Sequence, residues 1–74
     1  MNFILFTIDG CTKCFKAKKL LENNGVDYIE KNVLHDLDAR TELIELVNEV
    51  IVPILINKGN NEILKWNQLQ LMYK

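Results

Sequence analysis

The strongest pattern in the chain is an alternation of apolar, β-branched runs with segments of helical periodicity. Residues 3–8 (Phe-Ile-Leu-Phe-Thr-Ile) are almost continuously apolar, which predicts a strand that is buried on both faces at the centre of a sheet. An Asp-Gly pair ends this run. From residue 12 to residue 24 the apolar positions recur at helical spacing, and Asn-Asn-Gly at 23–25 supplies a left-handed helix end. The sequence therefore predicts a central strand that leads directly into an amphipathic helix.

The next two predicted elements are a weaker strand and a second helix. Residues 26–33 (Val-Asp-Tyr-Ile-Glu-Lys-Asn-Val) are less apolar, which indicates an edge or half-exposed strand. A strand, a helix and a strand joined by short turns imply a parallel pair with a right-handed crossover. Asp36 or Asp38 can cap a second helix that runs to Val47 or Asn48, and acids in its first turn suit the helix dipole.

The second half of the chain predicts two further strands joined by a hairpin. The run 50–57 is apolar and β-branched, but Pro53 lacks a backbone N–H and belongs at the first residue of the strand or just before it. Turn residues at 58–61 lead into a short returning strand at 62–65.

Asn67 is placed to cap a final helical segment, residues 68–73, which is too short to be stable without docking on the sheet. No repeat, low-complexity tract or linker interrupts the chain. We therefore predict one α/β domain over residues 1–74, in the order β-α-β-α-β-β-α, with a four-stranded mixed sheet flanked by helices.

Charge narrows the classes of partner. The net charge is −1, so the overall field gives no reason to expect nucleic acid or an anionic membrane as a partner. Four lysines do cluster shortly after the first helix begins: Lys13, Lys16, Lys18 and Lys19. They are too few for nucleic-acid binding and are compatible with a solvated helix face. The first residues lack the pattern of an export signal, and no apolar run is long enough to span a bilayer, so we expect a cytoplasmic protein. We also expect it to be a monomer.

The two cysteines are Cys11 and Cys14, at the junction of the first strand and the first helix. A disulfide that closes so short a loop stabilises a fold by roughly 2 kcal/mol, against about 3 for a loop of 15 residues. A structural disulfide is therefore the weaker interpretation. A redox or metal-binding role in a reducing compartment is the stronger one.

The position of the thiols predicts different roles for them. Cys11 would precede the first helical turn, where free backbone N–H groups and the dipole favour a thiolate by ~0.3–2 kcal/mol. Cys14, one turn later on the apolar face, would be less exposed. We expect Cys11 to attack a disulfide and Cys14 to displace the product from the mixed disulfide. Lys13 and Lys16 oppose the dipole; they either hold a thiolate or an anionic substrate, or serve solubility alone.

Metal binding is the main alternative, because two thiols also make half of a zinc site. His35 is the single histidine and the one candidate third ligand, but a histidine in a loop is an ordinary observation, so we predict no metal site. A carrier of Cu(I), or a redoxin that bridges a cluster between monomers, could use the same pair of thiols. Small metallochaperones, however, need two hairpin strands after the first helix, whereas residues 26–33 precede an acidic helix. A third hypothesis, an adaptor with vestigial thiols, is disfavoured because both cysteines are present.

Four segments together resemble the glutaredoxin family: small glutaredoxins and the glutaredoxin-like redoxins that serve ribonucleotide reductase. The segments are Cys11-Thr12-Lys13-Cys14 after a strand, Ala17-Lys18 with Leu21, Gly25-Val26-Asp27-Tyr28, and Val52-Pro53. The resemblance covers nearly the whole chain and implies a thioredoxin fold. It also implies that the proline is cis and lies against the dithiol, with the backbone before it pairing with bound peptide or glutathione. By this resemblance we assign substrate binding to Val52 and Pro53. Thr12 and Lys13, which lie between the two cysteines, are further candidates for substrate binding.

The chain also departs from the family pattern. Thr12-Lys13 replaces the usual Pro-Tyr, and Ile51 replaces the Thr or Ser before Val-Pro. Leu-Lys-Trp-Asn at 64–67 stands where family members carry Gly-Gly and an acid that help to bind glutathione, so part of that site is missing. Trp66 belongs either to the core or to a partner contact, and the core is the favoured interpretation.

We therefore expect a small dithiol oxidoreductase that reduces protein or low-molecular-weight disulfides and donates electrons to a cytosolic enzyme. It would need no cofactor other than glutathione, if glutathione is the reductant. A thioredoxin-reductase-like enzyme is the other candidate reductant.

Overall fold

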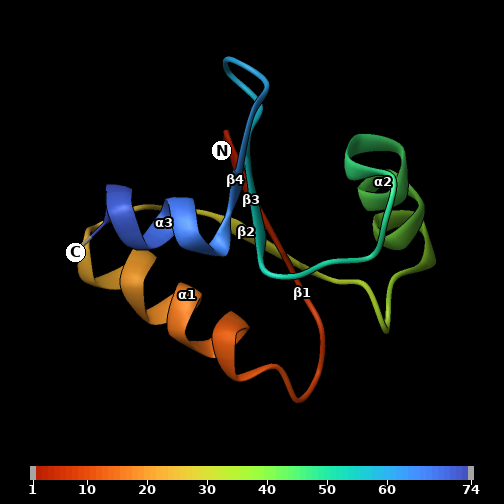
Figure 1. Cartoon of the computed structure of the whole chain (residues 1–74), viewed down its shortest axis with the longest axis horizontal. Coiled ribbons are helices and arrows are strands. Elements are labelled where there is room, and N and C mark those ends of the chain that lie inside the picture. The colour runs from red at the N-terminus through yellow and green to blue at the C-terminus, as the bar shows by residue number, and fades with distance from the viewer. Residues whose placement is uncertain (1, 74) are drawn as a thin grey trace.

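The chain folds into a four-stranded sheet with helices on both faces, as the computed structural model of residues 2–73 shows (Figure 1). Met1 and Lys74, the ends of the predicted domain, lie outside the described residues. The elements are β1 (Phe3–Thr7), α1 (Thr12–Asn23), β2 (Ile29–Asn32), α2 (Leu37–Val47), β3 (Ile54–Asn57), β4 (Glu62–Lys65) and α3 (Trp66–Met72). The predicted order of elements and the mixed sheet are confirmed.

The sheet has the order β2-β1-β3-β4, so β1 lies inside it and β2 lies at an edge, as predicted. β1 runs parallel to β2 and antiparallel to β3, and β3 runs antiparallel to β4. The register pairs Phe6 of β1 with Ile54 of β3. The start of β3 therefore lies beside the end of β1.

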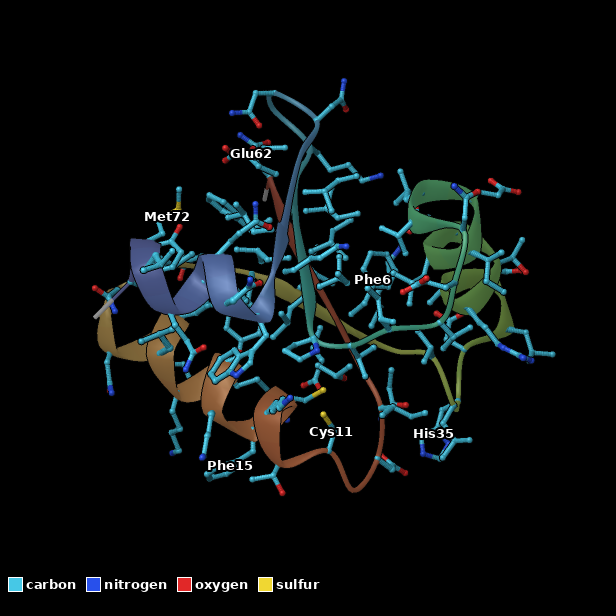
Figure 2. The ribbon with its side chains drawn as sticks, viewed as in Figure 1. Phe6, Cys11, Phe15, His35, Glu62 and Met72 are labelled. Carbon is cyan, nitrogen blue, oxygen red and sulfur yellow. The ribbon has the colours of Figure 1, made fainter. Side chains whose placement is uncertain are left out.

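Two hydrophobic cores occupy the two faces of the sheet, because alternate residues of a strand point to opposite sides. Phe6 and Ile54 pack with Leu43 of α2 on one face (Figure 2). Leu5 and Leu55 pack with residues of α1 and α3 on the other. Leu5 and Phe6 are both 0% exposed. Full burial of such a side chain stabilises a fold by about 1.5–3 kcal/mol, so the continuously apolar run is explained by two-sided burial.

The residues that end α1 also determine where the next strand begins. Gly25 has φ 68°, and its N–H donates to the Glu22 carbonyl at 3.1 Å. The Val26 N–H donates to the Leu21 carbonyl at 2.9 Å, which completes a Schellman motif. The predicted left-handed helix end is confirmed. The predicted start of the second strand at Val26 is wrong, because that residue still caps the helix and β2 begins only at Ile29.

The caps of the other helices correct one prediction and settle another. Asp36 caps α2, because its carboxylate accepts the Ala39 N–H at 3.1 Å, while Asp38 lies in the first turn. Asn67 does not cap the last helix. β4 passes directly into α3, and the Gln68 side-chain oxygen accepts the Lys65 N–H at 2.8 Å instead.

Pro53 lies just before β3, which is one of the two positions that its missing N–H allows. The sheet ladder begins at Ile54, so the predicted strand was too long at its start: residues 50–52 approach the sheet without joining it. No helix within residues 2–73 combines the length and the apolar character needed to cross a membrane.

Gly25 gives a test of this local structure. We expect Gly25→Ala to lower the free energy of unfolding by about 1–2 kcal/mol, because a left-handed φ penalises a β-carbon. Among the described residues other than Gly25 and its two chain neighbours, no heavy atom lies within 4 Å of the position of that β-carbon, so the cost is one of backbone conformation alone. Urea denaturation measures the change, and Gly25→Asn should restore part of the loss. Equal stability of wild type and Gly25→Ala would contradict this account.

Candidate active site at the start of α1

Cys11 and Cys14 lie where β1 turns into α1. Gly10, with φ 77°, makes the turn, and Cys11 is the N-cap residue of α1 in an extended conformation. Both thiols are free. Figure 2 shows Cys11 at the first turn of α1, with its sulfur directed toward the sheet. The two predicted catalytic residues therefore lie one helical turn apart, with Cys11 at the helix N-terminus.

Hydrogen bonding and burial distinguish the two sulfurs. The Cys14 N–H donates to Cys11 Sγ at 3.1 Å, so an otherwise unpaired donor of the first turn points at that sulfur. Cys11 is half-buried, whereas Cys14 is 2% exposed, as its place on the apolar face predicts. Burial, followed by the hydrogen bond with Cys11, raises the pKa of Cys14 to about 12. Cys14 is therefore a protonated thiol at neutral pH.

A polar cluster lies beside the dithiol on the α1 face of the sheet. Thr7, 1% exposed, donates its hydroxyl to Glu30 Oε2 at 2.7 Å. Lys18 Nζ lies 3.2 Å from the same oxygen. These three residues line a cleft of about 400 Å³ together with both cysteines. The positive charge of Lys18 favours the thiolate form of Cys14, so it offsets part of the rise in pKa that burial causes.

Thr7 and Glu30 were not among the site residues predicted from the sequence. One signal was available: Thr7 is the single hydroxyl residue in a run expected to be buried on both faces. A buried hydroxyl needs a partner, but the pattern alone does not show that this partner comes from β2.

A second cluster holds the loop before Cys11. His35 Nε2 contacts Asp9 Oδ2, and Asn32 Nδ2 donates to Asp9 Oδ1 at 2.6 Å. The hydrogen bonds from His35, then Asn32, lower the pKa of Asp9. His35 is thus a loop residue engaged with Asp9, on the far side of the loop from the thiols (Figure 2). Within residues 2–73, no group of three or more His, Cys, Asp or Glu side chains is placed to hold a metal ion.

The segment before β3 lies at the end of the sheet where β1 leads into the dithiol, because Ile54 pairs with Phe6. The Val52–Pro53 peptide bond is cis, which agrees with the family resemblance, and Pro53 is buried. Val52, Pro53 and Lys13 line one hollow of about 280 Å³. Thr12 lies in the cleft beside Cys11 instead. The structure therefore brings together three of the four residues assigned to substrate binding, and places the fourth in the cleft that contains both cysteines.

Trp66 packs against the core between the sheet, α1 and α3, as the favoured interpretation predicts. It is only half-buried, and it also lines the hollow at Pro53. Part of its side chain is therefore exposed beside Pro53.

The raised pKa of Cys14 gives a pH prediction. In Cys11→Ser, we expect the remaining thiol to ionise well above its ordinary pKa of 9.0 in the folded protein, because it stays buried, and near 9.0 in urea. Because folding favours the protonated thiol, its contribution to stability is complete below pH 9.0 and is lost as the pH rises through the raised folded-state pKa. Ultraviolet absorbance of the thiolate measures the titration, and the double variant Cys11→Ser/Cys14→Ser supplies the background from tyrosine. A folded-state pKa near 9.0 would contradict the account.

Comparison with known proteins agrees with this geometry. The family model for glutaredoxin matches residues 3–61. An uncharacterized glutaredoxin-like 8.6 kDa protein in the rubredoxin operon of Clostridium pasteurianum is 28% identical over 67 residues, 90% of this chain and 88% of that protein. Global transcriptional regulator Spx 2 of Bacillus cereus is 36% identical over 59 residues. That match covers 76% of this chain but only 45% of the regulator.

Solved structures establish the fold as thioredoxin-like. The thioredoxin-like protein BC3987 superposes with a TM-score of 0.82 at 24% identity, over 95% of this chain and 93% of that one. The glutaredoxin-like protein NrdH-redoxin from Escherichia coli superposes with a TM-score of 0.75 at 19% identity, over 100% of this chain and 97% of that one.

Proposed function

The chain belongs to the glutaredoxin family, and from this premise we propose that it is a thiol–disulfide oxidoreductase that passes electrons to a cytosolic enzyme through Cys11 and Cys14. The observation that carries the proposal is the asymmetry of the two sulfurs. One accepts a backbone N–H at a helix N-terminus, and the other is buried and protonated. A nucleophile and a resolving thiol need this difference.

The reaction follows from that asymmetry. The Cys11 thiolate attacks one sulfur of a substrate disulfide; the substrate S–S bond breaks, a mixed disulfide with Cys11 forms, and the leaving thiolate takes a proton from water. Cys14 then gives up its proton and attacks Cys11 Sγ. The S–S bond between the two cysteines forms, and the second substrate thiolate leaves with a proton. The substrate gains two electrons and two protons, and an external reductant restores the dithiol.

The groups around the thiols suit this sequence of steps. Lys18 favours the anionic form of Cys14, which is required only when Cys14 attacks. Val52 precedes the first ladder residue of β3, so its backbone is not part of the sheet ladder. We assign to it the pairing with substrate backbone, next to the buried ring of Pro53.

The reductant in this proposal is a thioredoxin-reductase-like enzyme. The segment 64–67 forms the end of β4 and the first turn of α3, and it brings Lys65 and Trp66 to the hollow at Pro53. Among the described residues 2–73, no acidic residue lines this hollow, so an acidic partner for the amino group of glutathione is missing there. The likeness to NrdH-redoxin, whose activity profile is described as thioredoxin-like, supports the same choice.

The reductant is tested by insulin reduction with two coupled systems: NADPH with thioredoxin reductase, and glutathione with glutathione reductase. We expect the first to be faster by about tenfold to a hundredfold, because one lost hydrogen bond to a charged group costs ~1.5–3 kcal/mol. A control variant, Lys58→Gln in the distant hairpin, should keep the wild-type rates with both.

Equal rates with the two reductants would overturn the assignment of the reductant. Absence of activity with either, in a protein shown to be folded and reduced, would overturn the oxidoreductase itself.

The metal-carrier alternative is less well supported by the site. Metal binding requires thiolates, and a thiol with a pKa of about 12 gives up its proton to a metal at a cost. Titration of the reduced protein with Cu(I) discriminates between the hypotheses. We expect weak binding that does not survive a competing chelator, and tight stoichiometric binding without disulfide exchange would favour the carrier.

A further inference from the structure

A groove of about 450 Å³ lies between α1 and α3, and the proposed reaction does not use it. Three aromatic side chains line it: Phe15, Trp66 and Tyr73. Phe15 is 58% exposed and points away from the core (Figure 2). A large aromatic ring held open to solvent beside two half-buried ones is a feature of binding surfaces.

The charge of the groove has one sign. Lys16 and Lys19 line it, and none of its lining residues is acidic. Within residues 2–73, the lysines that form ion pairs are Lys18, Lys31 and Lys58, so neither groove lysine is neutralised by an acid. Lys19 Nζ lies 5.5 Å from the centre of the Phe15 ring, which keeps the charge next to the apolar surface.

The groove is continuous with the proposed site. Trp66 lines both the groove and the hollow at Pro53, and Phe15 lines both the groove and the cleft at Cys11. From Cys11, Lys16 and Lys19 lie roughly 7 and 12 Å along the helix axis, at ~1.5 Å per residue. Extended chain covers these distances in about two to four residues, at ~3.3 Å each.

We propose that this groove binds an acidic segment of the protein whose disulfide is reduced. The segment carries one aromatic or large aliphatic residue and carboxylates about two to four residues from the reacting cysteine. The apolar side chain lies among Phe15, Trp66 and Tyr73, and the carboxylates pair with Lys16 and Lys19. This inference deepens the proposed function and rests on it, because the groove is useful only to a substrate that reaches Cys11.

The test uses two peptides, each oxidised to its disulfide-linked dimer. In one, glutamates stand two and four residues after the cysteine, with a tryptophan between them; in the other, glutamines replace the glutamates. Oxidation of the reduced protein in a single turnover is followed by acid quenching and mass spectrometry. We expect the acidic dimer to react about fivefold faster at low salt, as two surface ion pairs allow, and the difference to shrink at high salt.

Charge variants test whether the preference for the acidic peptide arises in the groove. Lys19→Glu should remove this preference, and Gln70→Lys, which adds a positive charge to the groove from α3, should increase it. Arg40→Glu on α2, on the opposite face of the sheet, is the matched control and should keep the wild-type preference. A gain of rate in Gln70→Lys is an outcome that misfolding does not produce.

A small neutral disulfide, 2-hydroxyethyl disulfide, is too short to reach the groove and should oxidise the wild type and these variants at equal rates. Failure of this reaction in all proteins would contradict the proposed function itself. If 2-hydroxyethyl disulfide reacts normally, two results would overturn only the proposal about the groove. One is that the wild type shows no preference for the acidic peptide, and the other is that the preference survives in Lys19→Glu. Concentration-dependent dimerisation that Lys19→Glu abolishes would also overturn it, because a second copy would then occupy the groove.

Discussion

The burial of β1 on both faces is the constraint on which the rest of the structure depends. Because Leu5 and Phe6 fill opposite cores, β1 is fixed at the centre of the sheet, and its end fixes the position of Cys11. The antiparallel register that pairs Phe6 with Ile54 then brings Pro53 to the same end of the strand. Cys11 and Pro53, some forty residues apart in the chain, are thus positioned at one end of the sheet by a ladder of backbone hydrogen bonds inside a hydrophobic core. Few other elements are needed to position the reacting groups at this edge of the sheet, which is consistent with a chain of 74 residues.

The same core creates the difference between the sulfurs. One helical turn separates a half-buried N-cap residue from a side chain that the core encloses, so Cys14 is kept protonated chiefly by desolvation, with a further contribution from its hydrogen bond with Cys11. The nearby Lys18–Glu30 pair, supported by Thr7, places charge beside that thiol without exposing it to bulk water. In this account the reactivity of Cys11 and the inertness of Cys14 have one origin, which is the place where the strand enters the helix.

Much of the fold and the position of Cys11 at the start of α1 could be predicted from the sequence, because periodicity, Gly25 and the acids at the start of α2 act locally. The errors arose where a competing hydrogen bond decided the outcome. The Gln68 side chain, not Asn67, satisfies the start of α3, and the backbone of Val26 closes α1 before β2 begins. The contact between Thr7 and Glu30 depends on the parallel register of β1 and β2, and the groove depends on how α3 docks beside α1. This contact and this groove depend on how the elements pack in three dimensions, so they could not be predicted from the pattern of residues along the sequence.

The central claim is that Cys11 attacks and Cys14 resolves, and trapping of the mixed disulfide tests it most directly. Reduced Cys14→Ser, mixed at neutral pH with a protein that carries an accessible disulfide, should accumulate a covalent complex joined through Cys11, because the resolving thiol is absent. Reduced Cys11→Ser should form no complex on the same timescale, because its remaining thiol is buried and protonated. Peptide mapping identifies the bond. A complex joined through Cys14 at a comparable rate, or no complex with Cys14→Ser, would contradict the account.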